Sequence, residues 1–341
     1  YKYMLSMAGV AGALSLGGIN TIVTRSVSQG FEGAFVQSLK TQFKWSFIQF
    51  LFIFSLAGYY FINDNIIYTI SFCIASICVP LSAIANTYSA FLSGKKDFKT
   101  SSLYSFLSTC VYALTFSLVA IFIPNTLTII TAYLVVTTSA NVYFCFRTIR
   151  TYKPNTMTQD GDNSYAIKLS VTNSFGIIAA NIDSIIVYHL LGPISLAIYN
   201  FAIIIPDKIR SLFGFIHTIA LPKLSAHSES KKGVIFYYTL LIGIFSLVLI
   251  GAYIILAPYI FKFLFPNYLD SISFSQLYGI SLIALPATFI MTVLSAYKME
   301  KQLYFLNIFI PILKILLLAV FIFMWGILGA IIARVITVGV H

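Results

Sequence analysis

Residues 181–211, NIDSIIVYHLLGPISLAIYNFAIIIPDKIRS, combine long apolar segments with charged residues inside those segments. The stretch predicts the end of one membrane-spanning helix, a tight corner at Leu191-Gly192-Pro193 and most of the next helix. Asp183 falls inside the first helix, and the second contains Asp207, Lys208 and Arg210. A charge near the centre of a bilayer costs about 3 kcal/mol or more, so it usually faces a cavity or a partner of opposite charge.

The composition of the whole chain is that of a polytopic membrane protein. Apolar residues make up 59% of the 341 residues and charged residues only 9%, with a mean hydropathy of +0.92. A soluble domain carries about 25% charged residues. The length fits one membrane domain with short loops and leaves no room for a separate soluble catalytic domain. The four cysteines lie in apolar segments without zinc-type spacing to histidine, so we predict no metal site and no cofactor.

Eleven apolar runs are long enough to cross a hydrocarbon core of about 30 Å as helices. They lie near residues 3–23, 44–62, 66–92, 101–123, 126–147, 165–190, 195–222, 233–257, 271–296, 302–324 and 326–340. The predicted fold class is therefore an all-α polytopic membrane protein with about 11 spans.

Basic residues are distributed unevenly between two alternating sets of connecting loops. Three short connectors, at 63–65, 124–126 and 192–194, contain no lysine or arginine. Fifteen of the 21 basic residues fall in the other set of loops, against Lys2 and Lys262 on the outer side, and this excess marks the cytoplasmic side. The same distribution argues against a nucleic-acid partner, despite a net charge of +11. Because the first run then passes from outside to inside, we expect a first helix that this chain lacks, and twelve helices in all.

A weak internal repeat divides the chain into two halves. Residues 1–3 resemble 199–201 at the start of a span, and residues 21–26 resemble 218–225 near its end. Such repeats are typical of transporters. We therefore predict two six-helix bundles around a central cavity. The N-terminal bundle spans 1–150 (helices 2–6), a polar cytoplasmic linker spans 151–164, and the C-terminal bundle spans 165–341 (helices 7–12).

Six ionisable residues are predicted to lie well inside spans: Asp183, Asp207, Lys208, Arg210, Lys314 and Arg334. Four are basic and two are acidic, so a cavity that contained all six would have a net charge of +2 and would favour an anionic ligand. Arginine suits phosphate in particular, because its planar guanidinium donates two parallel hydrogen bonds.

The alternative is that these residues pair with one another and only hold the helices together. Asp207 and Arg210 have the i,i+3 spacing of a pair on one helix face. Lys314 or Arg334 could neutralise Asp183, or their long side chains could reach a membrane surface. Asp183 itself could equally bind a proton or a sodium ion, so both roles stay open at this point.

Several motifs, in order along the chain, resemble one family. The corner at 191–193 with Ile198-Tyr199-Asn200-Phe201-Ala202, the segment Pro206-Asp207-Lys208-Ile209 and Leu221-Pro222-Lys223-Leu224-Ser225 are similar to bacterial polysaccharide biosynthesis proteins. These are O-antigen-type flippases of the multidrug/oligosaccharidyl-lipid/polysaccharide exporter superfamily. Two N-terminal stretches, 16–27 and 84–98, resemble the second helix and the fourth helix with its following loop.

The resemblance implies a transporter and not an enzyme. The implied substrate is an undecaprenyl-diphosphate-linked oligosaccharide, moved from the cytoplasmic to the periplasmic leaflet of the bacterial inner membrane. The expected binding residues are Arg25, Lys208, Arg210, Lys314 and Arg334, with Asp183 and Asp207 as charge partners or as sites for a coupling H⁺ or Na⁺. Membrane lipids and other polysaccharide assembly proteins are expected partners. The alternatives are a cation-coupled multidrug exporter of the same superfamily and a membrane glycan polymerase.

Overall fold

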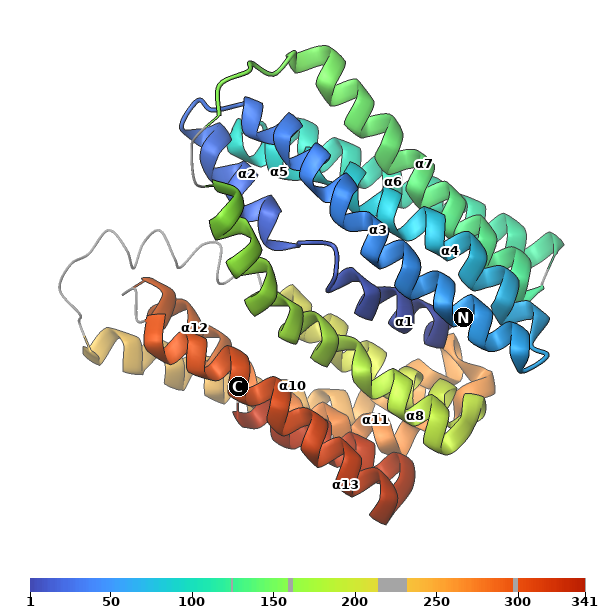
Figure 1. Cartoon of the computed structure of the whole chain (residues 1–341). Coiled ribbons are helices and arrows are strands. Elements are labelled where there is room, and N and C mark those ends of the chain that lie inside the picture. Colours follow the sequence, from blue (N-terminus) through green and yellow to red (C-terminus); the bar gives the residue numbers. More distant parts are fainter. Residues whose placement is uncertain (124, 159–161, 214–231, 297–299, 341) are drawn as a thin grey trace. The chain divides into compact units, whose positions relative to one another are not determined.

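The computed structural model describes residues 1–341 except 124, 159–161, 214–231, 297–299 and 341, and the described residues form helices and no strands (Figure 1). The α-helices are α1 (Lys2–Gly12), α2 (Gly18–Ser28), α3 (Gly33–Ile62), α4 (Ile66–Ala85), α5 (Thr87–Gly94), α6 (Phe98–Phe122), α7 (Thr126–Tyr152), α8 (Asp162–Leu212), α10 (Lys232–Leu264), α11 (Ser271–Gly279), α12 (Leu285–Ala296) and α13 (Glu300–Val340). Two short 3₁₀ helices, η1 (Pro266–Tyr268) and η2 (Ile280–Ala284), complete the described elements.

Within this described part, eight helical segments are long and apolar enough to cross a membrane. The predicted all-helical membrane class is therefore confirmed. The motif at 221–225 and the repeat segment 218–225 lie outside the described residues.

Close contacts divide the chain into two units, Tyr1–Asn181 and Ile182–His341. The division falls inside α8 and not at the polar linker 151–164, because the first half of α8 packs on α1 and α2. The Gly18 amide donates to Ser170 Oγ at 3.0 Å, and Ser174 Oγ donates to the carbonyl of Ala13 at 2.7 Å. The predicted bundle boundaries at 150 and 165 stay a prediction.

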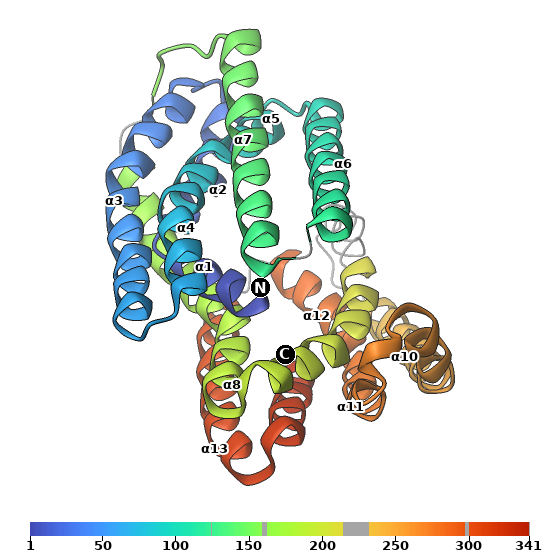
Figure 2. The same ribbon diagram turned by 90° about the vertical axis from the view of Figure 1, so that its right-hand side faces the viewer.

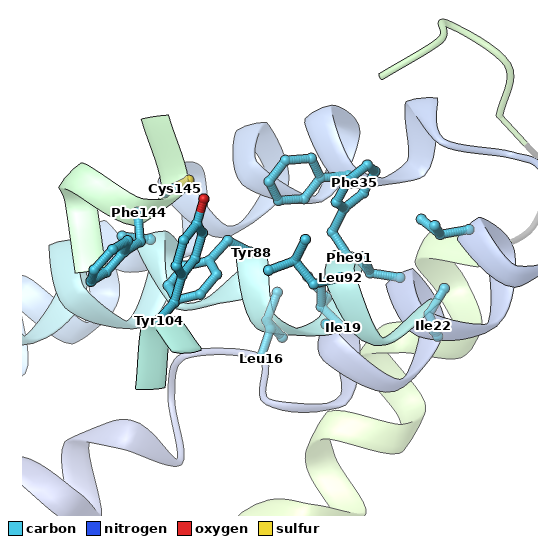
Figure 3. Packing of buried hydrophobic residues seen from close by; sticks show 14 residues of the cluster. Leu16, Ile19, Ile22, Phe35, Tyr88, Phe91, Leu92, Tyr104, Phe144 and Cys145 are labelled. Atoms are coloured by element: carbon cyan, nitrogen blue, oxygen red, sulfur yellow. The ribbon is translucent and has the colours of Figure 1, made fainter. Parts of the chain in front are cut away.

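The first unit is built on long helices that lie side by side. α3 packs on α4, α4 packs on α7, and α7 packs on α6 (Figures 1 and 2). At one end, aromatic side chains from α3, α5, α6 and α7 form a buried cluster with residues of α2. In it Tyr104 stacks on Phe144 at 4.3 Å and Phe35 lies against Phe91 at 4.8 Å between ring centroids (Figure 3). α6, by contrast, buries almost nothing but Tyr104, as expected of a helix whose apolar side chains face lipid.

Two of the predicted spans in the first unit are interrupted. The sequence predicts one continuous helix over 3–23, but α1 ends at Gly12 and α2 begins at Gly18. Glycine is a poor helix former, and the Ser174 hydroxyl satisfies the Ala13 carbonyl that the break leaves free. The run 66–92 is likewise divided into α4 and α5 at Asn86, six residues after Pro80.

The loop between α2 and α3 is fastened to the segment that follows α7. Asn155 Oδ1 accepts from the amides of Glu32 and Gly33, and Lys95 donates to the Glu32 carboxylate. The hydrogen bond from the Lys95 ammonium holds the pKa of Glu32 below its usual value. The linker that the sequence predicts therefore begins as a segment fastened by hydrogen bonds.

In the second unit the chain turns sharply at two glycines. α8 turns at Gly192, where φ is +86°, and α13 turns at Gly326, where φ is +57° (Figure 2). Both conformations belong to the left-handed region that side chains with a Cβ rarely adopt. These corners match the predicted boundaries at 190–195 and 324–326. They bring the two halves of each helix together and so assemble the charged residues.

The corner in α13 places Gly329 close to the backbone of Phe321. A Cβ on this residue would lie 1.9 Å from the backbone oxygen of Phe321. We expect Gly329→Ala to lower the free energy of unfolding by about 1–3 kcal/mol, because the turn must open to accept the methyl group. Gly339→Ala on the same helix is the matched control, since nothing lies within 4 Å of its Cβ position. Thermal unfolding of the purified variants in detergent tests this, and equal melting temperatures for both variants would contradict it.

Candidate functional site

Asp183 lies at the centre of a charged network inside the second unit. Its side chain is fully buried in α8, and Tyr199, across the Gly192 corner, donates to its Oδ2 at 2.8 Å. Two cations from α13 reach the same oxygen: Lys314 Nζ at 3.2 Å and Arg334 Nη1. The two α13 residues stand on opposite sides of the Gly326 corner, so the turn is what brings both to one carboxylate.

Arg334 connects Asp183 to the second carboxylate of the network. Its Nη2 donates to Asp207 Oδ2 at 2.7 Å, and its Nε donates to the hydroxyl of Tyr278 at 3.0 Å. That hydroxyl in turn donates to Asp207 Oδ1 at 2.6 Å. Tyr278 is fully buried and comes from α11, so this network joins three helices: α8, α11 and α13.

Arg210 is bound less completely than Arg334. Its Nη2 donates to Ser281 Oγ at 2.7 Å, and its Nη1 lies 3.6 Å from Asp207 Oδ1. Its Nε is buried and has no hydrogen-bond partner within the described residues. The guanidinium also lies 5.7 Å from the ring centroid of Tyr278. Arg210 therefore keeps hydrogen-bonding capacity that a ligand could use.

The cations of the network face a cavity of about 490 Å³ in the second unit. Arg210, Lys314 and Arg334 line it, together with two threonines and a set of apolar residues: Ala284, Ala287, Thr288, Met291, Ile310, Thr337 and Val338. No carboxylate is among these lining residues. Three cations against the two carboxylates Asp183 and Asp207 leave the network a net charge of +1. An anionic group with an apolar attachment fits such a surface.

Five of the seven residues predicted from the sequence meet in this network: Asp183, Asp207, Arg210, Lys314 and Arg334. Lys208 is exposed and is not a lining residue of the cavity. Arg25 is exposed in the last turn of α2, in the first unit. The pairings that the sequence left as an alternative are present, since Asp207 pairs with Arg210 and Asp183 with both Lys314 and Arg334. The assignment of ligand-binding roles stays a prediction.

Sequence reasoning missed Tyr278, Tyr199 and Ser281 as parts of the site. A tyrosine is uncharged, so it carries no insertion penalty that would single it out among 22 tyrosines in the chain. The one available signal was the polarity of residues 271–281, which place Ser271, Ser275, Tyr278 and Ser281 in a predicted span. Of the histidine, cysteine, aspartate and glutamate residues in the described ranges, no three form a group able to hold a metal ion.

Comparisons with known proteins agree with this architecture. The family model described as "Polysaccharide biosynthesis protein" matches residues 3–273. A comparison with the curated proteins finds no match.

Solved structures show the same fold. A multidrug resistance MATE family transporter of the MOP superfamily, in its inward-facing conformation, has a TM-score of 0.69 at 13% identity, covering 100% of this chain and 86% of its own. The lipid II flippase MurJ, in an inward closed conformation, also has 0.69, at 14% identity, covering 98% and 79%. A MOP superfamily transporter from Pyrococcus furiosus, with a binding pocket of reverse polarity, has 0.65 at 14% identity, covering 99% and 82%.

Proposed function

The chain belongs to the polysaccharide biosynthesis protein family, and from that premise we propose that it is a flippase for a lipid-linked oligosaccharide. It is a multi-pass membrane protein with the fold of MOP superfamily transporters. The proposed substrate is an undecaprenyl-diphosphate-linked oligosaccharide, moved from the cytoplasmic to the periplasmic leaflet of the bacterial inner membrane. The product would supply assembly of a surface polysaccharide such as O-antigen or capsule.

The polarity of the cavity in the second unit is the observation that carries the proposal. Within the described part of the chain, the ionisable residues that line it are Arg210, Lys314 and Arg334, and all three are cations. A diphosphate presents several oxygen acceptors, and guanidinium groups bind such oxygens through two parallel hydrogen bonds. The apolar lining residues offer contacts to the uncharged parts of the substrate. The same polarity disfavours a cationic drug, so a multidrug exporter is the weaker candidate.

The network also suggests how the site would respond to its ligand. A diphosphate that bound Arg210 and Arg334 would compete with the carboxylates Asp207 and Asp183, which pair with these cations in the structure. Loosening these pairs would weaken the links among α8, α11 and α13 and so favour a change of conformation, as alternating access requires. A released carboxylate would then be free to take a coupling H⁺ or Na⁺.

The direction of transport follows from charge. An interior-negative membrane favours outward movement of anions by about 2.3 kcal/mol per charge for each 100 mV. In this scheme Arg25, at the end of α2 assigned to the cytoplasmic side, would attract the headgroup first. Membrane lipids would surround the polyprenyl tail, and other polysaccharide assembly proteins would receive the product.

The double variant Lys208→Ala with Arg210→Ala tests the proposal in cells that lack the native gene. We expect surface polysaccharide to disappear and lipid-linked oligosaccharide to accumulate, while the protein remains in the membrane. The matched control is Lys2→Ala with Lys262→Ala, which removes two cations predicted to lie on the opposite side of the membrane. Normal surface polysaccharide in the first double variant would contradict the proposal. If that variant instead changed the susceptibility of the cells to drugs, a multidrug exporter would be favoured.

A further inference from the structure

A second cavity, of about 330 Å³, lies wholly inside the first unit and has a different chemistry. Its volume is in the range of about 300–1,000 Å³ that is usual for small-molecule sites. None of the described residues that line it is charged. The polar ones are Ser82, Asn86, Tyr133, Thr137, Thr138 and Asn141.

Two neighbouring helices provide these residues with the same spacing. The α4–α5 segment contributes positions 78, 79, 82, 83 and 86, and α7 contributes positions 133, 134, 137, 138 and 141. Each set covers one face of a helix, at i, i+1, i+4, i+5 and i+8. Residues of α1 close the cavity. The polar residues therefore form two rows that face each other, one on the α4–α5 segment and one on α7, near Asn86, where α4 ends and α5 begins.

The hydrogen bonds within the cavity leave both donors and acceptors for a ligand. Asn141 Nδ2 donates to Ser82 Oγ at 2.8 Å, which leaves the Ser82 hydroxyl able to donate. Thr137 Oγ1 donates to the carbonyl of Tyr133 at 2.7 Å and Thr138 Oγ1 to that of Cys78 at 3.1 Å, so both oxygens remain acceptors. The Asn86 side chain makes no capping hydrogen bond to α5, and its amide offers both a donor and an acceptor.

We propose that this uncharged cavity binds a glycosyl unit of the substrate, an inference that rests on the proposed flippase function. Sugar hydroxyls are donors and acceptors at once, and side-chain amides and hydroxyls pair with them without a charge. The face of an aromatic ring such as Tyr133 packs against the apolar face of a pyranose. An anion would lose its hydration here without gaining a cation, so the cavity selects against the diphosphate.

Binding of three probes to the full chain in lipid nanodiscs tests the inference. The probes are undecaprenyl diphosphate alone, the same lipid carrying one hexose, and the same lipid carrying one N-acetylhexosamine. We expect the wild type to bind at least one sugar-bearing probe about tenfold more tightly than the bare lipid, as two ordinary neutral hydrogen bonds would give. The double variant Thr137→Val with Asn141→Leu should lose this preference and bind the bare lipid as the wild type does.

Three controls separate the site from a general loss of folding. Thr131→Val with Ser139→Ala removes two hydroxyls from α7 at positions that do not line the cavity, and it should keep the preference. Thr137→Ser retains the hydroxyl and should keep it as well. The melting temperature of each variant in the nanodisc is measured alongside.

The outcomes distinguish this inference from the function on which it rests. A wild type that binds none of the three probes overturns the flippase proposal, and the glycosyl site with it. A wild type that binds all three probes equally overturns the glycosyl site alone. The glycosyl site alone is also overturned if the double variant keeps the preference, or if it weakens the binding of all three probes to the same extent.

Discussion

Replacing Asp183 by leucine is expected to lower the free energy of unfolding by about 3–5 kcal/mol, because it leaves two buried cations without their shared carboxylate. Asp183 is fully buried, and its Oδ2 receives Lys314, Arg334 and the hydroxyl of Tyr199. Arg334 retains Asp207 as a partner at 2.7 Å, whereas Lys314 loses the carboxylate that lies 3.2 Å from its Nζ. The loss of the Lys314–Asp183 pair is therefore one cause of the lower stability.

The double variant Asp183→Leu with Lys314→Leu isolates that cause. Removing a buried charged pair together costs far less than removing one partner, since no uncompensated charge remains. We expect the double variant to be more stable than Asp183→Leu alone, with a melting temperature nearer that of the wild type. Thermal unfolding in detergent, with the amount of protein in the membrane measured in parallel, checks both variants. A double variant that is less stable than the single one would show that Lys314 stabilises the unit by something other than its pair with Asp183.

The helical class and the corner positions followed from simple features of the sequence. The sequence predicted a corner at Leu191-Gly192-Pro193 and a boundary between two spans at 324–326, and the structure has left-handed backbone at Gly192 and Gly326. The break between α1 and α2 was missed because its stabilising contact, from Ser174 to Ala13, joins residues 161 positions apart. The hydropathy of a segment contains no information about its contacts with residues far away in the sequence.

The sequence pointed to most residues of the network but not to the way they are joined. A charge in an apolar helix must find a partner, and this argument selected six residues, of which Lys208 lies outside the network. The sequence offered the pairs Asp207–Arg210 and Asp183 with Lys314 or Arg334 only as alternatives. It did not show that Arg334 joins both carboxylates, because that depends on the two turns and on Tyr278, an uncharged residue. One distinction was available: residues advance about 100° per position on a helix, so Asp207 and Arg210 share a face while Lys208 does not.

That distinction underlies the prediction with the largest effect on transport, which compares Arg210→Ala with Lys208→Ala. Arg210 lines the basic cavity, and its buried Nε has no hydrogen-bond partner within the described residues, whereas Lys208 is exposed and lies outside the cavity lining. A hydrogen bond to a charged group contributes about 1.5–3 kcal/mol, so losing one such bond to the diphosphate weakens binding roughly 10- to 100-fold. We expect that loss of affinity for Arg210→Ala. For Lys208→Ala we expect the affinity to change less than about twofold, because an exposed charge contributes little free energy.

Binding of undecaprenyl diphosphate to the two variants in nanodiscs, and surface polysaccharide in cells lacking the native gene, measure the difference. Arg210→Lys adds a test of geometry: it keeps the charge but loses the planar fork, so its affinity should fall between those of the wild type and Arg210→Ala. Equal losses in Lys208→Ala and Arg210→Ala would mean that a general positive potential attracts the substrate, and that the cavity at Arg210 is not where the diphosphate binds. A loss confined to Arg210→Ala would instead mean that the effect of the Lys208→Ala, Arg210→Ala double variant comes from Arg210 alone. Its guanidinium, which contacts Ser281 and Asp207, would then be the group in the basic cavity that binds the diphosphate.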